Sequence, residues 1–396
     1  MIDLGLSEKN LNEFINTEFG KTVRLFEGTS SLYKRFSSTE VEQYLIGLEG
    51  HLHKYVMIYG GASAPFPHAN TNFFTESQNT ILRKSLNSGA SLKIEQLERR
   101  HPDISKICRS IENRLGGESW AKVFWTPANQ KGLDIHFDTT AVFCFQLEGS
   151  KRWRVWDELE FNPTKPMSKV LKIDELNNPI MDIILKPGDV LYMPAGFPHC
   201  TFALDEPSLS VSISHSAPKL IDILMYGLEE AAKSHGFLRT PKLPSFENKG
   251  SFQKLLGEAT EVIQGLDIPA LERMYSASQV AGRADINSTS IFSSLIADEI
   301  EDETTVQWVE SQSIELRRYE DKIIVSLPST IIPEKPLLVG SPPYLELPNT
   351  VEDELLDITS GRISKIKDIV GGLDIPSKVL LVKTLIKYGL MRVVLV

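Results

Sequence analysis

The chain has 396 residues, of which 24% are charged and 41% are hydrophobic, and its formal net charge at pH 7 is −10. This length suits two or three domains, at about 150 residues per domain, and the composition is that of an ordinary folded protein. The acidic balance argues against a protein that mainly binds the phosphate backbone of nucleic acid, since that function favours a basic surface.

The cysteines and the apolar runs limit the cellular setting. Three cysteines, Cys108, Cys144 and Cys200, are too few and too scattered for a disulfide framework or a zinc cluster. The start of the chain, "MIDLGLSEKNLNEFI", lacks the basic and then apolar pattern of a signal peptide. No apolar run approaches the roughly 18 residues of a membrane span. We therefore expect a reduced, cytoplasmic protein.

Residues 1–216 combine an early helical segment with short strand-like runs. The runs are apolar or alternating, and Gly, Pro and Asn separate them. They are "YVMIYGG", "AKVFWTP", "AVFCFQLEG", "WRVW", "DIILKPGDVLYMP" and "LSVSISH". Several short strands with this spacing predict a mainly β core, either a barrel or a sandwich.

Residues 217–305 follow a helical period. In "SFQKLLGEATEVIQGL" apolar residues recur at steps of three and four, which predicts an amphipathic helix. The segment "IFSSLIADEIEDE" continues in this manner and ends in an acidic run. This block is either a docking or dimerisation element or a cover for its own barrel, and the sequence leaves both open.

Residues 306–396 predict a strand, two helices and a final strand. "DKIIVSLP" alternates as a strand, Thr350 is a candidate N-cap, Pro376 suits a helix start and Gly389 suits a helix end. This order is typical of a small winged-helix module. A DNA-binding module would place basic side chains in the major groove. Because residues 346–396 are near charge balance, we expect a structural or substrate-facing role for this module in place of DNA binding.

A candidate metal site lies in "GLDIHFDTT". On a strand, residues i and i+2 point to the same face, so His136 and Asp138 should point together. The segment "LKPGDVLYMPAGFPHC" supplies a strand and a tight reversal that ends at His199. Two histidines and one carboxylate with open positions are the ligand set of non-haem Fe(II) oxygenases. Each histidine alone would also be consistent with a core or surface residue.

Lys151, in "EGSKRW", follows the next predicted strand. If its side chain points into the barrel, its buried charge requires an anion. A dicarboxylate co-substrate that binds the metal with one end would present its second carboxylate about one strand length away. The other interpretation is a lysine in a solvated hairpin turn.

The first part of the chain resembles the JmjC family of 2-oxoglutarate oxygenases, and within it the ribosomal oxygenases. The resemblance rests on "FWTPANQKGLDIHFDTTAVFCFQLEGSKRW", on "LKPGDVLYMPAGFPH" and, more weakly, on "GASLKIEQLERRHPDI". It implies a double-stranded β-helix (cupin/JmjC) catalytic domain over residues 1–216. A helical dimerisation region over 217–305 and a winged-helix-like domain over 306–396 should follow, and the protein should be a homodimer.

The resemblance also implies roles for single residues. His136, Asp138 and His199 correspond to the Fe(II) ligands, and Lys151 to the residue that pairs with the distal carboxylate of 2-oxoglutarate. Ser214 corresponds to a serine that assists the same co-substrate in some members. The implied reaction consumes O2 and 2-oxoglutarate and hydroxylates an amino-acid side chain, most plausibly of a ribosomal protein.

One residue departs from the family pattern. Lys122 stands where animal members have an asparagine, and this change concerns the pocket wall and the target residue, not the iron chemistry. Two alternatives remain beside the leading hypothesis. The same chemistry would serve another protein or a ribosomally made peptide, and a non-catalytic cupin would bind a metal as a scaffold or sensor.

Overall fold

A computed structural model describes residues 6–48, 51–60, 77–164, 167, 171–239, 249–267, 271, 275, 293, 295–309, 315–319, 321–326 and 344–394. The chain forms two compact units. The first consists mainly of Met1–Leu115 and Ser119–Ser216, and the second mainly of Ala217–Arg283 and Thr289–Val396. Among the described residues, no helix has both the length and the apolar character that a membrane crossing requires.

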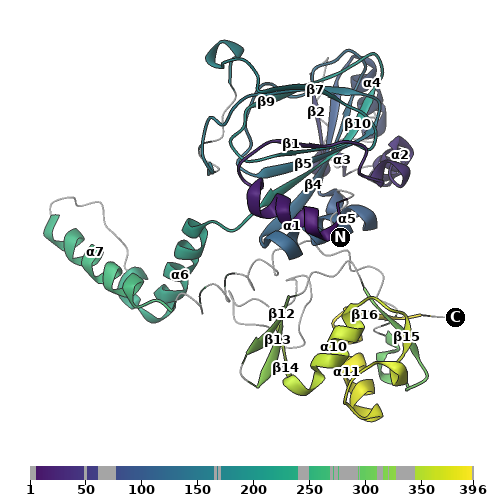
Figure 1. Cartoon of the computed structure of the whole chain (residues 1–396), viewed down its shortest axis with the longest axis vertical. Helices are drawn as coiled ribbons and strands as arrows, with labels where there is room; N and C mark the ends of the chain where they lie inside the picture. The colour runs from purple at the N-terminus through teal and green to yellow at the C-terminus, as the bar shows by residue number, and fades with distance from the viewer. Residues whose placement is uncertain are drawn as a thin grey trace. The chain divides into compact units, whose positions relative to one another are not determined.

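The core of the first unit consists of a seven-stranded and a three-stranded sheet, so the predicted mainly β core is confirmed. The strand order is β1-β8-β5-β10-β4-β3-β2 in the larger sheet and β7-β6-β9 in the smaller. Figure 1 labels β1, β2, β4, β5 and β10 of the larger sheet and β7 and β9 of the smaller. The strands are β1 (Arg24–Phe26), β2 (Val56–Tyr59), β3 (Ser91–Glu95), β4 (Glu118–Thr126), β5 (Ala141–Glu148), β6 (Lys151–Val155), β7 (Met181–Leu185), β8 (Val190–Met193), β9 (His199–Ala203) and β10 (Ser208–Ser216).

All six predicted runs form strands, and three further strands were missed. β1, β3 and β9 did not stand out in the sequence because each is at most five residues long and carries polar or charged residues. Such strands depend on their neighbours for stability. β3, for instance, pairs with β2 on one side and β4 on the other.

Strand β5 is buried on both faces, which explains its continuous apolar sequence. Phe143 and Phe145 belong to the larger hydrophobic core, to which the helices also contribute. Val142 and Cys144 point to the other side and pack with Trp153 and residues of the smaller sheet. The strand thus separates the core beneath the helices from the interior between the two sheets.

Five helices complete the first unit. They are α1 (Glu8–Thr17), α2 (Ser38–Gly47), α3 (Leu52–Tyr55), α4 (Gln78–Asn87) and α5 (Pro102–Leu115). In α5, Ile104, Ile107, Cys108 and Ile111 recur at helical spacing and are all buried in the larger core. The helices thereby cover one side of the larger sheet and leave its other side to the interior between the sheets.

The second unit begins with two helices, α6 (Leu220–Ser234) and α7 (Lys249–Gln264), which contact each other. α7 confirms the helix that the apolar period predicts. Gly227 of α6 lies against the chain that follows α7, because a Cβ there would lie 2.7 Å from the Leu271 side chain and 3.2 Å from that of Leu266. Of the predicted acidic helical segment, the part before residue 295 lies almost wholly outside the described residues. The part that follows contains the short 3-10 helix Ala297–Glu299.

The other described residues of the second unit form two three-stranded sheets and two α-helices. One sheet has the order β15-β11-β16 and the other β12-β13-β14. The elements are β11 (Thr305–Trp308), β12 (Glu315–Tyr319), β13 (Lys322–Ser326), β14 (Tyr344–Pro348), α10 (Glu352–Thr359), β15 (Ser364–Lys365), α11 (Ile375–Lys387) and β16 (Met391–Val393).

The predicted order of strand, helix, helix and strand is present here, with one wrong cap. Thr350 lies in the 3-10 turn Asn349–Val351, and α10 has Val351 at its N-cap position. Thr350 is not the N-cap of α10 because it already belongs to the preceding 3-10 turn. Pro376 does lie in the first turn of α11, where Asp374 caps the helix. Gly389, with φ of +71°, ends it as predicted.

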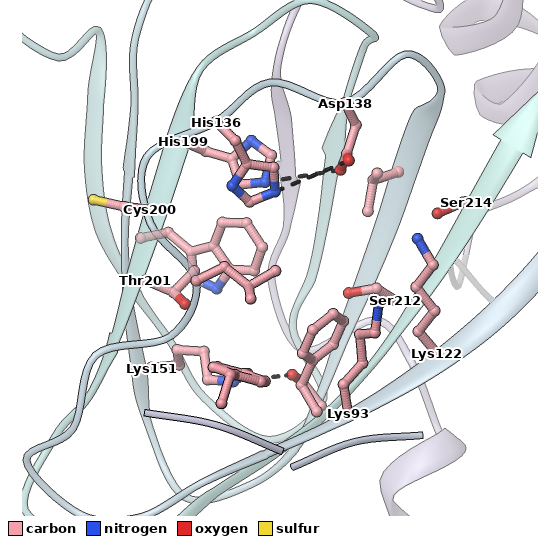
Figure 2. A pocket seen from close by; sticks show the side chains of 16 residues that line it. Lys93, Lys122, His136, Asp138, Lys151, His199, Cys200, Thr201, Ser212 and Ser214 are labelled. Carbon is pink, nitrogen blue, oxygen red and sulfur yellow. Dashed lines mark hydrogen bonds and ion pairs between the residues drawn. The ribbon is translucent and has the colours of Figure 1, made fainter. Parts of the chain in front are cut away.

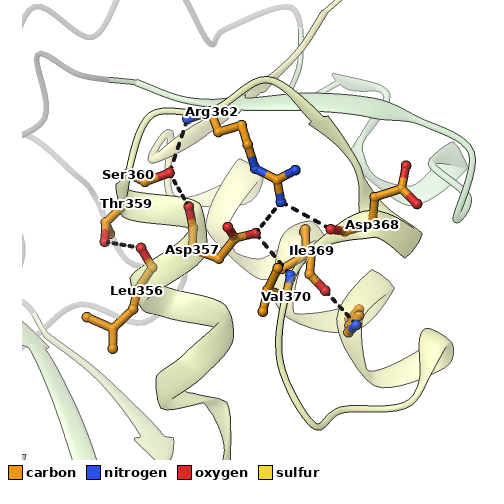
Figure 3. A network of polar contacts seen from close by, with 9 residues as sticks. Leu356, Asp357, Thr359, Ser360, Arg362, Asp368, Ile369 and Val370 are labelled. Atoms are coloured by element: carbon orange, nitrogen blue, oxygen red, sulfur yellow. Dashed lines mark hydrogen bonds and ion pairs between the residues drawn. The ribbon is translucent and has the colours of Figure 1, made fainter.

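A polar network joins the end of α10 to the turn before α11 (Figure 3). Asp357 accepts hydrogen bonds from Arg362 at 2.7 Å and from the Val370 backbone N–H at 3.0 Å. Arg362 also donates to the Asp368 carbonyl at 3.1 Å. Burial tends to raise the pKa of Asp357, but these hydrogen bonds outweigh it and hold the pKa below its usual value. The carboxylate therefore fixes the connection between the two helices.

Candidate metal and co-substrate site

His136 and Asp138 lie between β4 and β5, in a segment that is extended but is not a regular strand. The prediction of a strand here was wrong in detail, because His136 pairs with only one residue, His199, in an isolated antiparallel bridge. The expected alternation still holds, since Ile135 and Phe137 are buried in a separate apolar cluster. The two polar side chains consequently point together.

His199 is the first residue of β9 and follows the reversal after β8. Gly196, with φ of +84°, makes this reversal, and a Cβ there would lie 1.9 Å from the Glu160 carbonyl oxygen. The Gly196 N–H donates to the Asp138 carbonyl at 2.9 Å. The His199 N–H donates to the His136 carbonyl, also at 2.9 Å. Backbone hydrogen bonds thus hold all three predicted ligands in register.

The three side chains converge (Figure 2). One potential ligand atom from each of His136, Asp138 and His199 lies within 4.8 Å of the other two. The Nε2 atoms of His136 and His199 are each 3.9 Å from a different carboxylate oxygen of Asp138. An ion at the roughly 2 Å typical of metal–nitrogen and metal–oxygen bonds can join two atoms that are at most about 4 Å apart, and both histidine–carboxylate pairs meet this limit.

Hydrogen bonds at the other ring nitrogens orient both imidazoles. His136 Nδ1 donates to the Asp134 carbonyl at 2.6 Å, and His199 Nδ1 donates to the Phe197 carbonyl at 3.1 Å. Since a carbonyl only accepts, Nδ1 carries the proton and a neutral ring keeps a lone pair on Nε2. Burial, together with the neighbouring His136, lowers the pKa of His199 to about 4, so this ring is neutral at pH 7.

Lys151 lies at the opposite end of the cavity, and only 2% of its surface is exposed. Its ammonium donates a hydrogen bond to Ser210 Oγ at 3.2 Å. Burial lowers its pKa from the ordinary 10.5 to about 8. Among the described residues, no carboxylate forms an ion pair with this ammonium. The hairpin interpretation of Lys151 is therefore wrong: the side chain is buried and lines the same cavity as the two histidines.

The cavity between the two ends has a volume of about 240 Å³. Strand β10 contributes Ser210, Ser212 and Ser214 to its wall, because alternate residues of a strand share a face. The intervening Leu209, Val211 and Ile213 point into the larger core. Ser214 therefore lines the cavity, but the serine that contacts Lys151 is Ser210, which the sequence reasoning missed. The alternating serines of "SLSVSISHS" were the signal that could have revealed it.

Other lining residues also escaped the sequence reasoning. Tyr59, Lys93 and Phe124 contribute to the wall, together with Lys122, which the sequence had placed there. Tyr59 and Lys93 come from β2 and β3, so only the pairing of these strands with β4 brings them to the cavity. Trp153 also lines the cavity and stacks on the His199 ring, with ring centroids 5.7 Å apart and an interplanar angle of 22°.

A β core with an imidazole–carboxylate–imidazole cluster at one end of its cavity and a buried lysine at the other defines a cupin-like domain with a candidate metal centre. Comparison with known families makes this more specific. Residues 95–223 match the model of the JmjC domain. The chain therefore carries a JmjC domain, and the resemblance read from its motifs is confirmed.

Curated relatives match the same part of the chain. Ribosomal oxygenase 2 of Rattus norvegicus is 35% identical over 128 residues, which cover 31% of this chain and 26% of the relative. Ribosomal oxygenase 1 of Danio rerio is 33% identical over 136 residues, covering 32% and 24%. The "bifunctional lysine-specific demethylase and histidyl-hydroxylase NO66" of Drosophila persimilis is 34% identical over 131 residues, covering 32% and 18%. The match thus spans about a quarter or less of each relative.

Solved structures resemble the chain over nearly its whole length. The X-ray structure of YcfD from Escherichia coli has a TM-score of 0.60 and 15% identity, and the alignment covers 98% of both chains. A structure of the same ribosomal oxygenase in complex with cobalt and 2-oxoglutarate has a TM-score of 0.59 and 15% identity, covering 97% of this chain and 98% of the other. At this identity the likeness concerns the fold.

Proposed function

We propose that this protein is an Fe(II)- and 2-oxoglutarate-dependent oxygenase that hydroxylates an amino-acid side chain of a protein. The observation that carries the proposal is one cavity with two complementary ends. His136, Asp138 and His199 converge at one end, and the buried ammonium of Lys151 lies at the other. The matched relatives include ribosomal oxygenases and a histidyl-hydroxylase, which agrees with this chemistry.

The donor set fits a divalent iron ion. His136 and His199 offer Nε2 atoms on rings that are oriented by hydrogen bonds at Nδ1, and Asp138 offers a carboxylate that forms no closer ion pair among the described residues. Two imidazoles and one carboxylate form the facial triad that leaves positions open for a co-substrate and O2. When bound, iron supplies the activation of O2 that lets an oxygen atom enter a C–H bond.

Lys151 fits the far carboxylate of 2-oxoglutarate. An ammonium that is buried and lacks a carboxylate partner is costly, and an anionic ligand removes this cost. The Ser210 hydroxyl orients the ammonium, and the stacked Trp153 ring supports His199. Ser214 stays a prediction for co-substrate binding; its place in the cavity wall is consistent with that role. The chain itself thus binds, orients and shields the reactants.

The alternative is a cupin that binds a metal without turnover. It does not explain why a buried lysine faces the metal cluster across the cavity, since a metal scaffold has no need of an anion clamp. Anaerobic titration with Fe(II) and 2-oxoglutarate separates the two functions. An oxygenase gives a visible charge-transfer band that needs both additions and releases succinate once O2 enters. Metal binding without any effect of 2-oxoglutarate would favour the scaffold.

The substrate that best agrees with the relatives is a ribosomal protein. Comparing ribosomal proteins by mass spectrometry, from cells with and without the gene, tests this choice. A mass increase of one oxygen atom that depends on the gene supports it. An unmodified ribosome alongside active turnover of 2-oxoglutarate would point to another protein or to a ribosomally made peptide.

The second unit gives rise to a proposal on assembly. Leu220, Ile221 and Met225 are exposed large apolar residues on α6 of the single chain, so we propose that the helical region, residues 217–305, buries them in a homodimer. Light scattering of the intact protein and of Met225→Lys tests this. We also propose that residues 306–396 form a winged-helix-like domain and residues 1–216 a catalytic domain. A cytoplasmic location stays a prediction of the sequence.

A further inference from the structure

Lysine side chains dominate the charge of the cavity wall. Lys93, Lys122 and Lys151 line it, whereas the only acidic lining residue among those described is Asp138. The charges of Lys151 and Asp138 already have a role in the proposed function. A divalent metal and Lys151 together balance Asp138 and the two carboxylates of 2-oxoglutarate, so the loaded end of the cavity carries no excess charge.

The other two lysines lie on neighbouring strands, on the side of the cavity formed by β3 and β4. In the register of these strands Lys93 is opposite Phe124 and Glu95 is opposite Lys122. Directly opposite and diagonal neighbours share a face, with diagonal positions roughly 7–8 Å apart. Lys93, Lys122 and Glu95 therefore form one small group at the cavity wall.

This cluster holds two ammonium groups and one carboxylate, and the carboxylate pairs with one of them. Glu95 accepts an ion pair from Lys93 at 2.7 Å, and the Lys93 side chain is only 14% exposed. Lys122 is half-buried, and among the described residues it forms no ion pair or side-chain hydrogen bond. In Figure 2 its side chain runs along the wall and ends at the level of Ser214. The Lys122 ammonium thus leaves one positive charge at the cavity wall without a carboxylate partner among the described residues.

We infer that Lys122 is a specificity-determining residue: it favours a target side chain with an acceptor oxygen or a carboxylate, such as Asn or Asp, and disfavours Arg and Lys. The inference rests on the proposed function, in which a metal ion and 2-oxoglutarate occupy the rest of the cavity. Placing a guanidinium or ammonium beside Lys122 in a half-buried cavity brings like charges together, and such contacts strongly suppress wrong partners. An amide or carboxylate oxygen instead accepts a hydrogen bond from the Lys122 ammonium.

The test measures binding rather than turnover. Full-length protein is loaded with Mn²⁺ and N-oxalylglycine, an inert analogue of 2-oxoglutarate, and loading is measured first by calorimetry. Peptide pools with one fixed central residue, Asp, Asn, His, Lys or Arg, and randomised flanks are then compared for binding. We expect the Asp and Asn pools to bind about tenfold more tightly than the Arg and Lys pools, given the cost of like-charge contacts.

Two variants and one control assign the preference to Lys122. Lys122→Met should reduce the difference between pools, and Lys122→Glu should invert it. Lys186→Glu makes the same charge change at an exposed lysine before β8 and should leave the wild-type preference intact. Thermal unfolding of each variant verifies that it is folded.

Each outcome decides a separate point. A wild-type preference for Arg or Lys pools, or no preference with normal loading, overturns the inference but leaves the proposed function standing. A Lys122 variant that loses N-oxalylglycine binding and keeps its peptide preference also overturns it, because Lys122 then belongs to the co-substrate site. A wild-type protein that fails to load overturns the proposed function, and the inference with it.

Discussion

Lys151 should make the ligand-free protein less stable than it would be with an apolar residue of similar length. The substitution Lys151→Met removes a positive charge that is 2% exposed and has no carboxylate partner among the described residues. Because the site is proposed to await an anion, its empty form carries an uncompensated cost. We therefore expect Lys151→Met to increase the free energy of unfolding while it abolishes tight binding of 2-oxoglutarate.

The magnitude follows from the depressed pKa. A decrease from 10.5 to about 8 corresponds to roughly 3 kcal/mol against the charged form, at about 1.4 kcal/mol for each pKa unit. The methionine also gives up the hydrogen bond to Ser210, which offsets roughly 1 kcal/mol. The net gain is about 2 kcal/mol, or roughly 4–8 °C in the melting temperature of a unit of this size.

The pH dependence has a definite sign. Below pH 8 the folded and the unfolded chain both carry the protonated Lys151, and the folded state bears the full cost of burial. Between pH 8 and 10.5 the folded state releases this proton while the unfolded state keeps it, so the wild type gains stability as pH rises. The advantage of Lys151→Met should therefore disappear across this range.

Urea unfolding of the full-length, ligand-free protein at pH 7 and pH 10 measures both quantities. Lys186→Met is the matched control, since the same change at this exposed lysine should alter stability by less than about 0.5 kcal/mol. A Lys151→Met protein that is less stable than the wild type at pH 7, with a difference that does not change at pH 10, would refute the reasoning. Retained 2-oxoglutarate affinity in this variant would refute the proposed role of the lysine.

Four further outcomes are expected. The affinity of the wild type for 2-oxoglutarate should fall as pH rises above about 8, because binding requires the protonated Lys151; calorimetry between pH 7 and 9.5 measures this. His199→Ala should abolish stoichiometric Mn²⁺ binding, measured by electron paramagnetic resonance, while the fold persists. Gly196→Ala should unfold at lower urea and bind Mn²⁺ more weakly, since its Cβ would meet the Glu160 carbonyl. Asp357→Ala should destabilise the second unit by about 1–3 kcal/mol in urea, because two donors lose their acceptor.

The metal cluster was predictable because its geometry depends on short local patterns. The HxD spacing placed His136 and Asp138 on one side, although the segment forms a single bridge instead of a strand. The turn before His199 contains Gly196, whose positive φ and crowded surroundings only glycine tolerates. Both features are visible in the sequence without knowledge of the strand order.

The residues at the opposite end of the cavity could not be predicted fully, because their positions depend on features that no local sequence pattern encodes. Lys151 belongs to the smaller sheet and β10 to the larger, so the packing of the two sheets decides which serine of β10 contacts the lysine. In the structure this serine is Ser210. Lys93 and Tyr59 reach the wall only because β3 pairs with β4 and β2 with β3. Register between distant strands is a tertiary property, so the sequence indicated the chemistry of the wall better than its exact membership.

The two ends of the cavity explain each other's composition. At one end a carboxylate faces two imidazoles, an arrangement that attracts a cation. At the other end an ammonium is buried with a hydroxyl as its only hydrogen-bond partner among the described residues, an arrangement that attracts an anion. A dicarboxylate that contacts both ends satisfies both charges at once, whereas a metal alone or an anion alone leaves one end uncompensated. If the proposed function holds, we therefore expect the cavity to bind a metal and a dicarboxylate together more tightly than either one alone.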